Sequence, residues 1–107
     1  MSDYKVKVTP NDKGNPPGKL ADAELLYTRP DDLLYGMRLI GFGIWSRRGS
    51  GGDRNVTFPA RQYSVNGERR SFALLRPTDD ITAQNRLREY IISEYDRYVA
   101  ELATSQK

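Results

Sequence analysis

The dipeptide Asn66-Gly67 constrains the fold of this chain most, because Asn-Gly between two extended segments is a strong signal for a two-residue β-hairpin turn. A turn of this length also decides which residues of the two strands face each other. Each face of the hairpin changes from apolar at its base to polar at its tip, so we expect the hairpin to project beyond the core. The predicted pairs on one face are Val65 with Glu68, Tyr63 with Arg70, Arg61 with Phe72 and Pro59 with Leu74; on the other face they are Ser64 with Arg69, Gln62 with Ser71, Ala60 with Ala73 and Phe58 with Leu75.

The hairpin lies in a segment whose positive charge comes from arginine alone. Residues 47–76 hold seven arginines, no lysine and two acidic residues, a formal charge of +5, whereas the other 10 basic and 12 acidic residues leave −2 elsewhere. A guanidinium group binds phosphate through two hydrogen bonds and stacks on bases, so this segment suits a nucleic acid. The predicted nucleic-acid-binding residues are Arg47, Arg48, Arg54, Arg61, Tyr63, Arg69, Arg70, Phe72 and Arg76, extended by Arg86 and Arg88 of the following segment.

The arginine pattern also has structural explanations. Contacts of Arg61 and Arg70 with their aromatic neighbours contribute about 0.5–1 kcal/mol each, so part of the pattern stabilises the hairpin itself. Arg86 and Arg88 have surface ion pairing with Glu89 or nearby acids as an equal explanation. A β-ribbon enters the major groove of duplex DNA, whereas exposed aromatic rings suit single strands or RNA. The sequence leaves the kind of nucleic acid open.

Two other classes of function remain as alternatives. In a protein-interaction or scaffold module, the sheet edge and the region of Trp45 bury against a partner whose acids pair with the arginines. In a metal enzyme, the carboxylates of Asp31, Asp32, Asp79 and Asp80 converge on a magnesium ion. Both aspartate pairs lie beside a proline in turn-like sequence, where aspartate commonly bonds to the local backbone. We expect that local role for them.

Histidine and cysteine are both absent from the chain. The usual general base near neutral pH, the usual zinc ligands and the serine and cysteine triads are therefore missing. We expect a protein that is not an enzyme and needs no cofactor and no small-molecule substrate. The chain has no apolar run long enough for a membrane span, and residues 1–5 lack the apolar core of a signal peptide. We therefore expect a cytoplasmic protein without a membrane partner.

Hydrophobic patterning predicts one α+β domain over residues 20–102, consisting of a small twisted antiparallel sheet, the projecting hairpin and a C-terminal helix packed on the sheet. Residues 1–19 read as a flexible tail, although the alternation over residues 4–8 is compatible with an edge strand. We expect a strand over residues 20–27, a central strand over 35–45, an edge strand over 54–65 because Pro59 cannot donate a ladder hydrogen bond, and a helix over 81–102, with residues 103–107 frayed.

Side-chain alternation and helical spacing predict which faces are buried. In the strand over residues 35–45, Leu39, Gly41 and Gly43 share one face, and the two glycines leave room for a ring or a neighbouring backbone, or mark a bend in the sheet. The helix should pack on the sheet through Leu87, Tyr90, Ile91, Glu94, Tyr95, Tyr98 and Leu102 and expose Arg88, Glu89, Ser93, Asp96, Arg97 and Ala100.

The order of these features resembles the stage V sporulation protein G family of small bacterial proteins. The resemblance covers residues 20–98 and is carried by the strand Met37-Arg38-Leu39-Ile40-Gly41-Phe42, the segment Arg54-Asn55-Val56-Thr57-Phe58-Pro59-Ala60-Arg61, the turn at Asn66-Gly67, Leu75-Arg76-Pro77 and the closing Glu94-Tyr95. It implies a homodimer that binds DNA or RNA site-specifically in gene regulation, without catalysis or cofactor. Arg86 corresponds to a basic residue that the family associates with binding.

Overall fold

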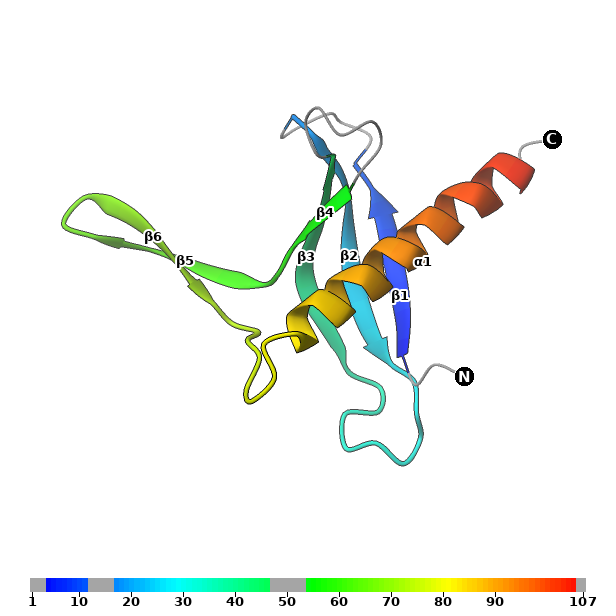
Figure 1. Cartoon of the computed structure of the whole chain (residues 1–107), viewed down its shortest axis with the longest axis horizontal. Helices are drawn as coiled ribbons and strands as arrows, with labels where there is room; N and C mark the ends of the chain where they lie inside the picture. Colours follow the sequence, from blue (N-terminus) through cyan, green and yellow to red (C-terminus); the bar gives the residue numbers. More distant parts are fainter. Residues whose placement is uncertain (1–3, 12–16, 47–53, 106–107) are drawn as a thin grey trace.

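The computed structural model describes residues 4–11, 17–46 and 54–105. Four strands form an antiparallel sheet in the order β1-β2-β3-β4, and two more form a separate hairpin. The single described helix crosses one face of the sheet, and the hairpin extends away from both (Figure 1). The α+β prediction is confirmed. The elements are β1 (Tyr4–Pro10), β2 (Lys19–Tyr27), β3 (Arg38–Ser46), β4 (Arg54–Thr57), β5 (Ala60–Val65), β6 (Glu68–Ala73) and α1 (Ala83–Ser105).

The core lies between the sheet and α1. Alternate residues of β2 and β3 point toward the helix, because successive side chains of a strand point to opposite faces. Ile91 is the helix residue at the centre of this contact and is 1% exposed. The predicted helix stripe is at least partly buried from Leu87 to Tyr98, whereas Leu102 is exposed. The buried residues are Ala21, Ala23, Leu25, Phe42, Ile44, Val56 and Ile91.

The predicted N-terminal tail is wrong for residues 4–10. These residues form β1, which pairs antiparallel with β2 along its whole length. Val6 and Val8 pack against the core, and Asn11 continues the contact by donating its backbone N–H to the Leu20 carbonyl at 3.0 Å. The alternating pattern supplies a strand with one apolar face, and the free edge of β2 supplies its partner. The packed unit therefore begins before residue 20.

The predicted face of Leu39 is also wrong, because β3 contains a bulge. Ala23 pairs with Phe42 but Leu25 pairs with Leu39, so β3 has one extra residue between these pairs. The bulge turns Leu39 toward the core together with Phe42. Gly41 lies in the bulge at φ +108°, and a Cβ there would come within 3.2 Å of the Pro59 side chain. The missing side chain thus lets the base of the hairpin approach β3.

Gly43, the second glycine predicted to leave room for a ring or a neighbouring backbone, lies against Trp45. A Cβ on Gly43 would lie 2.8 Å from the Trp45 Nε1 atom, so the indole occupies the space above this glycine. The indole N–H donates to the Thr57 hydroxyl at 2.9 Å, and the Lys19 ammonium lies 5.9 Å from the ring centroid. Gly43 therefore makes room for an aromatic ring of its own strand.

The predicted strand over residues 54–65 is divided at Pro59. Its first part is β4, an edge strand as expected, and its second part is β5 of the hairpin. Pro59 is buried, and its carbonyl accepts the Leu74 N–H at 3.0 Å. The predicted register is confirmed for all six pairs from Val65–Glu68 to Ala60–Ala73. Both hairpin strands are exposed along their full length.

The helix begins two residues later and ends three residues later than predicted, so residues 103–105 are helical rather than frayed. Asp80 organises its start. The Thr82 hydroxyl and N–H and the Arg86 guanidinium donate to the Asp80 carboxylate, and these bonds lower its pKa to about 2. Arg88, which was expected to face water, is partly buried.

The Asp80 contacts predict a pH-dependent stability. Because the pKa of Asp80 is lower in the folded than in the unfolded chain, its contribution is complete above about pH 4 and is lost as the pH falls toward 2. We expect Asp80→Asn to lack this component of the acid transition, measured by circular dichroism between pH 5 and 2. Asp79→Asn, which leaves the bonds of Asp80 in place, is the control. An unchanged acid transition in Asp80→Asn would contradict the prediction.

Candidate nucleic-acid interface

One face of the hairpin gathers arginine and aromatic side chains. The register places Arg61 opposite Phe72 and Tyr63 opposite Arg70 on the same face. Tyr63 is 41% and Phe72 is 49% exposed, and both line a surface depression with Arg61. Toward the tip, Arg70 forms an ion pair with Glu68 at 3.1 Å. We call this surface the aromatic face, and its members are Arg61, Tyr63, Arg70, Phe72 and Arg76.

Arg76 joins the aromatic face from the segment after β6. Its guanidinium carbon lies 4.2 Å from the centroid of the Phe72 ring, and its Nε donates to the Ala73 carbonyl at 3.1 Å. This stacking holds the ring in place and keeps the cation beside it. Three arginines and one glutamate therefore share a small exposed surface with two aromatic rings.

The opposite face of the hairpin is small and polar. Gln62 donates to the Ser71 hydroxyl across the two strands at 3.3 Å. Arg69, a predicted binding residue, lies on this face because it pairs with Ser64. It is separated from Arg70 by the thickness of the ribbon, since neighbouring residues of a strand point to opposite sides.

Three further predicted binding residues are engaged with the helix. Arg54 of β4 lies 3.9 Å from the Asp96 carboxylate and 5.7 Å from the centroid of the Tyr95 ring, so it ties the sheet edge to α1. Arg88 lies 5.4 Å from the centroid of Phe58 and donates to the Asn85 side chain at 2.7 Å. Its stem packs against the region where the hairpin leaves the sheet.

Arg86 donates to Asp80 at 2.8 Å and to the Thr82 hydroxyl at 3.2 Å. It lines an apolar groove between α1 and the sheet rather than the aromatic face. The sequence gives no local sign that Arg86 lines a groove, because the groove is assembled from five separate segments. Arg47 and Arg48 lie outside the described residues. The predicted binding residues therefore divide into the aromatic face, Arg69 behind it, and three arginines with structural contacts.

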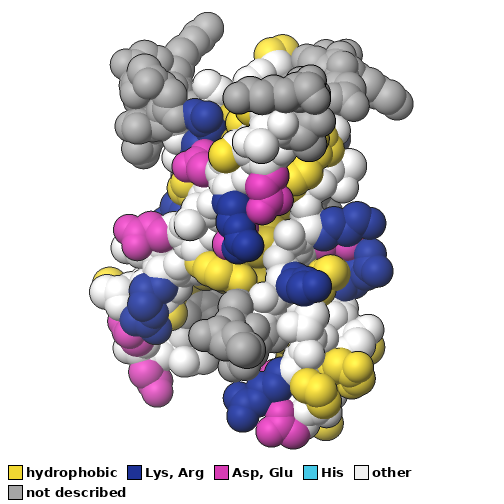
Figure 2. Space-filling model, turned by 90° about the vertical axis from the view of Figure 1, so that its right-hand side faces the viewer, with side chains coloured by type: hydrophobic (Ala, Val, Ile, Leu, Met, Phe, Trp, Pro, Cys, Tyr) yellow, Lys and Arg dark blue, Asp and Glu magenta, His cyan; other side chains and the backbone are white. Residues whose placement is uncertain are grey.

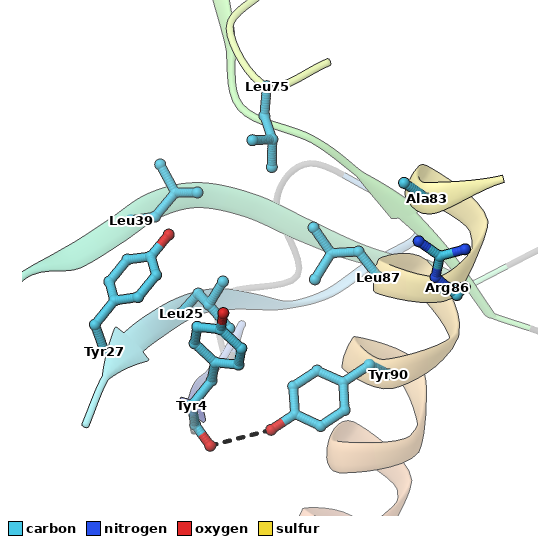
Figure 3. Close-up of a pocket in the computed structure, with 9 residues that line it drawn as sticks. All are labelled: Tyr4, Leu25, Tyr27, Leu39, Leu75, Ala83, Arg86, Leu87 and Tyr90. Carbon is cyan, nitrogen blue, oxygen red and sulfur yellow. Dashed lines mark hydrogen bonds between the residues drawn. The ribbon is translucent and has the colours of Figure 1, made fainter. Parts of the chain in front are cut away.

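The groove holds about 460 Å³ and has mainly aliphatic and aromatic walls (Figure 3). The Tyr90 hydroxyl donates to the Tyr4 carbonyl at 3.2 Å, shown as a dashed line, and the Tyr4 and Tyr27 rings meet edge to face at 5.4 Å. Burial, together with nearby Tyr4 and Asp32, raises the pKa of Tyr27. The lining residues are Tyr4, Leu25, Tyr27, Leu39, Leu75, Ala83, Arg86, Leu87 and Tyr90.

Three of the four aspartates considered for a metal site bond locally instead. Asp32 accepts the Leu34 N–H at 2.9 Å, and Asp31 accepts from the Arg29 side chain at 2.7 Å. Asp80 holds the start of α1, as described above. Within residues 4–11, 17–46 and 54–105, no group of three or more acidic side chains lies close enough to bind a metal ion.

The side of the molecule away from the hairpin has a different character. Figure 2 shows dark blue and magenta side chains side by side on this face, so the charges of both signs are mixed there. Yellow side chains gather at its lower edge, where Figure 1 places the connection between β2 and β3. In that connection Leu33 is 97% and Tyr35 is 56% exposed.

Comparison of the chain with protein-family models, with curated proteins and with solved structures found no match.

Proposed function

We propose that this protein binds nucleic acid through the aromatic face of its hairpin and acts as a non-enzymatic regulator. The observation that carries the proposal is that three arginines and two exposed aromatic rings share one face of the hairpin and of the segment directly after it, outside the core. Exposed rings of this size contribute little to the stability of the fold. They are well suited to bases, as the arginines are to phosphates.

The aromatic face gives a smaller binding surface than the sequence predicted. Arg61, Arg70 and Arg76 are the proposed phosphate contacts, and Arg69 reaches a strand that wraps around the hairpin edge. Arg54, Arg86 and Arg88 are assigned to structural roles by their contacts with Asp96, Asp80 and Phe58, respectively. The glutamate partner of Arg70 is itself exposed, so phosphate can replace it.

The resemblance to the stage V sporulation protein G family supports the same proposal. It adds site-specific binding, a role in transcription regulation in bacteria and a homodimer, and we propose a cytoplasmic location on the sequence alone. No helix among the described residues is long and apolar enough to cross a membrane.

A salt series tests the proposed function. We expect a fluorescein-labelled oligonucleotide to bind at 25 mM NaCl and to weaken steeply by 200 mM, because bound arginines release counterions from phosphate. Three phosphate contacts correspond to a slope of log K against log salt of about −2 to −3. The measurement is fluorescence anisotropy, with an uncharged peptide nucleic acid of the same sequence as the control. Absence of binding at low salt would reject the proposal.

A second candidate function is self-association or capture of a protein partner. It is favoured by the exposed apolar side chains of the β2–β3 connection and by the open groove beneath α1. Sedimentation velocity over a hundredfold range of protein concentration separates a monomer from a dimer. A Leu33→Asp variant that stays folded but loses the dimer would place the contact in this connection.

A further inference from the structure

We propose that the depression bounded by Arg61, Tyr63 and Phe72 receives one unpaired base, so that the ligand of the aromatic face is a single strand. The inference rests on the proposed function and narrows it to one class of nucleic acid. The sequence left single and double strands open, and the placement of the two rings favours the single strand.

The spacing of the two rings suits a flat group between them. Phe72 pairs with Arg61, and Tyr63 lies two residues further along β5 on the same face, so the aromatic residues are diagonal neighbours. Such neighbours are about 7–8 Å apart. Two flat groups in contact are about 3.5–4 Å apart, so a base contacts both rings when the rings stand at the separation of their residue positions. All three side chains line the same depression.

Within the described part of the chain, Tyr63 and Phe72 do not stack on each other. Arg76 covers Phe72 at 4.2 Å and fixes the orientation of its ring. Phe72 also lines the depression together with Tyr63. The contact with Arg76 therefore fixes one wall of the depression before a base binds. This lowers the conformational entropy that is lost on binding.

A duplex has no unpaired base that could enter this depression. In double-stranded DNA the flat faces of the bases are covered by their neighbours, and only the base edges are presented in the grooves. Pulling a base out of the stack costs a few kcal/mol. A single strand presents the flat faces directly, and stacking on an aromatic side chain tolerates any base.

Two arginines of the aromatic face, Arg61 and Arg70, lie beside the two rings. Arg61 lies opposite Phe72 and Arg70 lies opposite Tyr63, so each ring has a cation directly across the ribbon. A strand that inserts a base here passes its phosphates on both sides of the insertion. Arg61 and Arg70 are placed to bind those phosphates.

Ligands that expose their bases differently provide the test; the three single strands carry the same number of phosphates, and the duplex carries about twice as many. We propose anisotropy measurements with labelled dT15, U15, a 15-base-pair duplex and a 15-nucleotide strand of abasic residues. The expected result is binding of dT15 or U15 at least about tenfold tighter than the abasic strand and the duplex. A preference for dT15 or for U15 identifies DNA or RNA as the ligand. Tight binding of either one supports the proposal that the depression receives a base.

Variants locate the effect on the two rings. Tyr63→Leu and Phe72→Leu are each expected to weaken dT15 or U15 about tenfold and to leave the salt slope and the affinity for the abasic strand unchanged. Tyr35→Leu, which removes a ring that is 56% exposed in the β2–β3 connection, is the control and should leave the preference for dT15 or U15 over the abasic strand unchanged. Photo-crosslinking of an oligonucleotide containing 5-iodouracil should yield adducts on Tyr63 or Phe72 by mass spectrometry.

Two different failures are distinguishable. The single strands, the duplex and the abasic strand could bind equally well, with the aromatic variants binding like the wild type. That result would overturn the proposal that the depression receives a base, while leaving phosphate binding in place. Absence of binding to every one of these ligands at 25 mM NaCl would overturn the proposed function as well.

Discussion

Replacing Phe42 by alanine is expected to lower the free energy of unfolding by about 3–5 kcal/mol. Phe42 is 1% exposed in the central strand β3, and its ring meets that of Phe58 edge to face at 5.5 Å. The substitution leaves a cavity in the core between the sheet and α1, beside the ring of Phe58. For a domain of this size the midpoint of thermal unfolding should fall by about 12–20 °C, measured by circular dichroism.

The matched control is the same substitution on the hairpin. Phe72→Ala removes an identical ring that is 49% exposed, so we expect a change within about 1 kcal/mol. Similar losses for the two variants would contradict the placement of the core. The pair thus separates the residue that holds the fold from the residue offered to a ligand.

Reversing the charges of Arg61 and Arg70 is expected to weaken nucleic-acid binding at least about a hundredfold at 50 mM NaCl. Hydrogen bonds to a charged group contribute about 1.5–3 kcal/mol each, and the two glutamates would also repel phosphate. Both arginines are exposed on the aromatic face. The Arg61→Glu and Arg70→Glu double variant should therefore keep the stability of the wild type within about 1 kcal/mol.

An equal change of net charge elsewhere provides the control for that experiment. Arg29 and Arg97 lie in the β2–β3 connection and on α1, and both have more than half of their side chains exposed. The double variant Arg29→Glu and Arg97→Glu should retain most of the affinity, because it changes the total charge without touching the hairpin. Loss of binding in both double variants would indicate a general charge effect and would exclude the hairpin as the contact surface.

The hairpin could be derived from the sequence because its information is local. The Asn66-Gly67 turn specifies the register, and the register specifies that Arg61, Tyr63, Arg70 and Phe72 share one face. Each of these placements depends on residues fewer than a dozen positions apart. The same holds for the turn aspartates Asp32 and Asp80, whose partners lie two to six residues away.

Longer-range contacts changed the other predictions. Alternation along β3 gave Leu39 the wrong face, because β3 contains a bulge at Gly41, where Pro59 of a later segment lies against the strand. Arg54 and Arg88 were predicted to bind a ligand, yet each reaches an aromatic ring on another element. A guanidinium group suits a phosphate, a carboxylate and a ring equally, so only its neighbours in space select among them.

By itself the sequence determined the α+β class, the turn and the composition of the aromatic face, since periodicity and turn chemistry operate over a few residues. The tertiary structure alone decided that residues 4–10 complete the sheet and which arginines are used in packing. An edge strand and a guanidinium group both take whichever partner the fold brings near, and that partner lies far away along the chain.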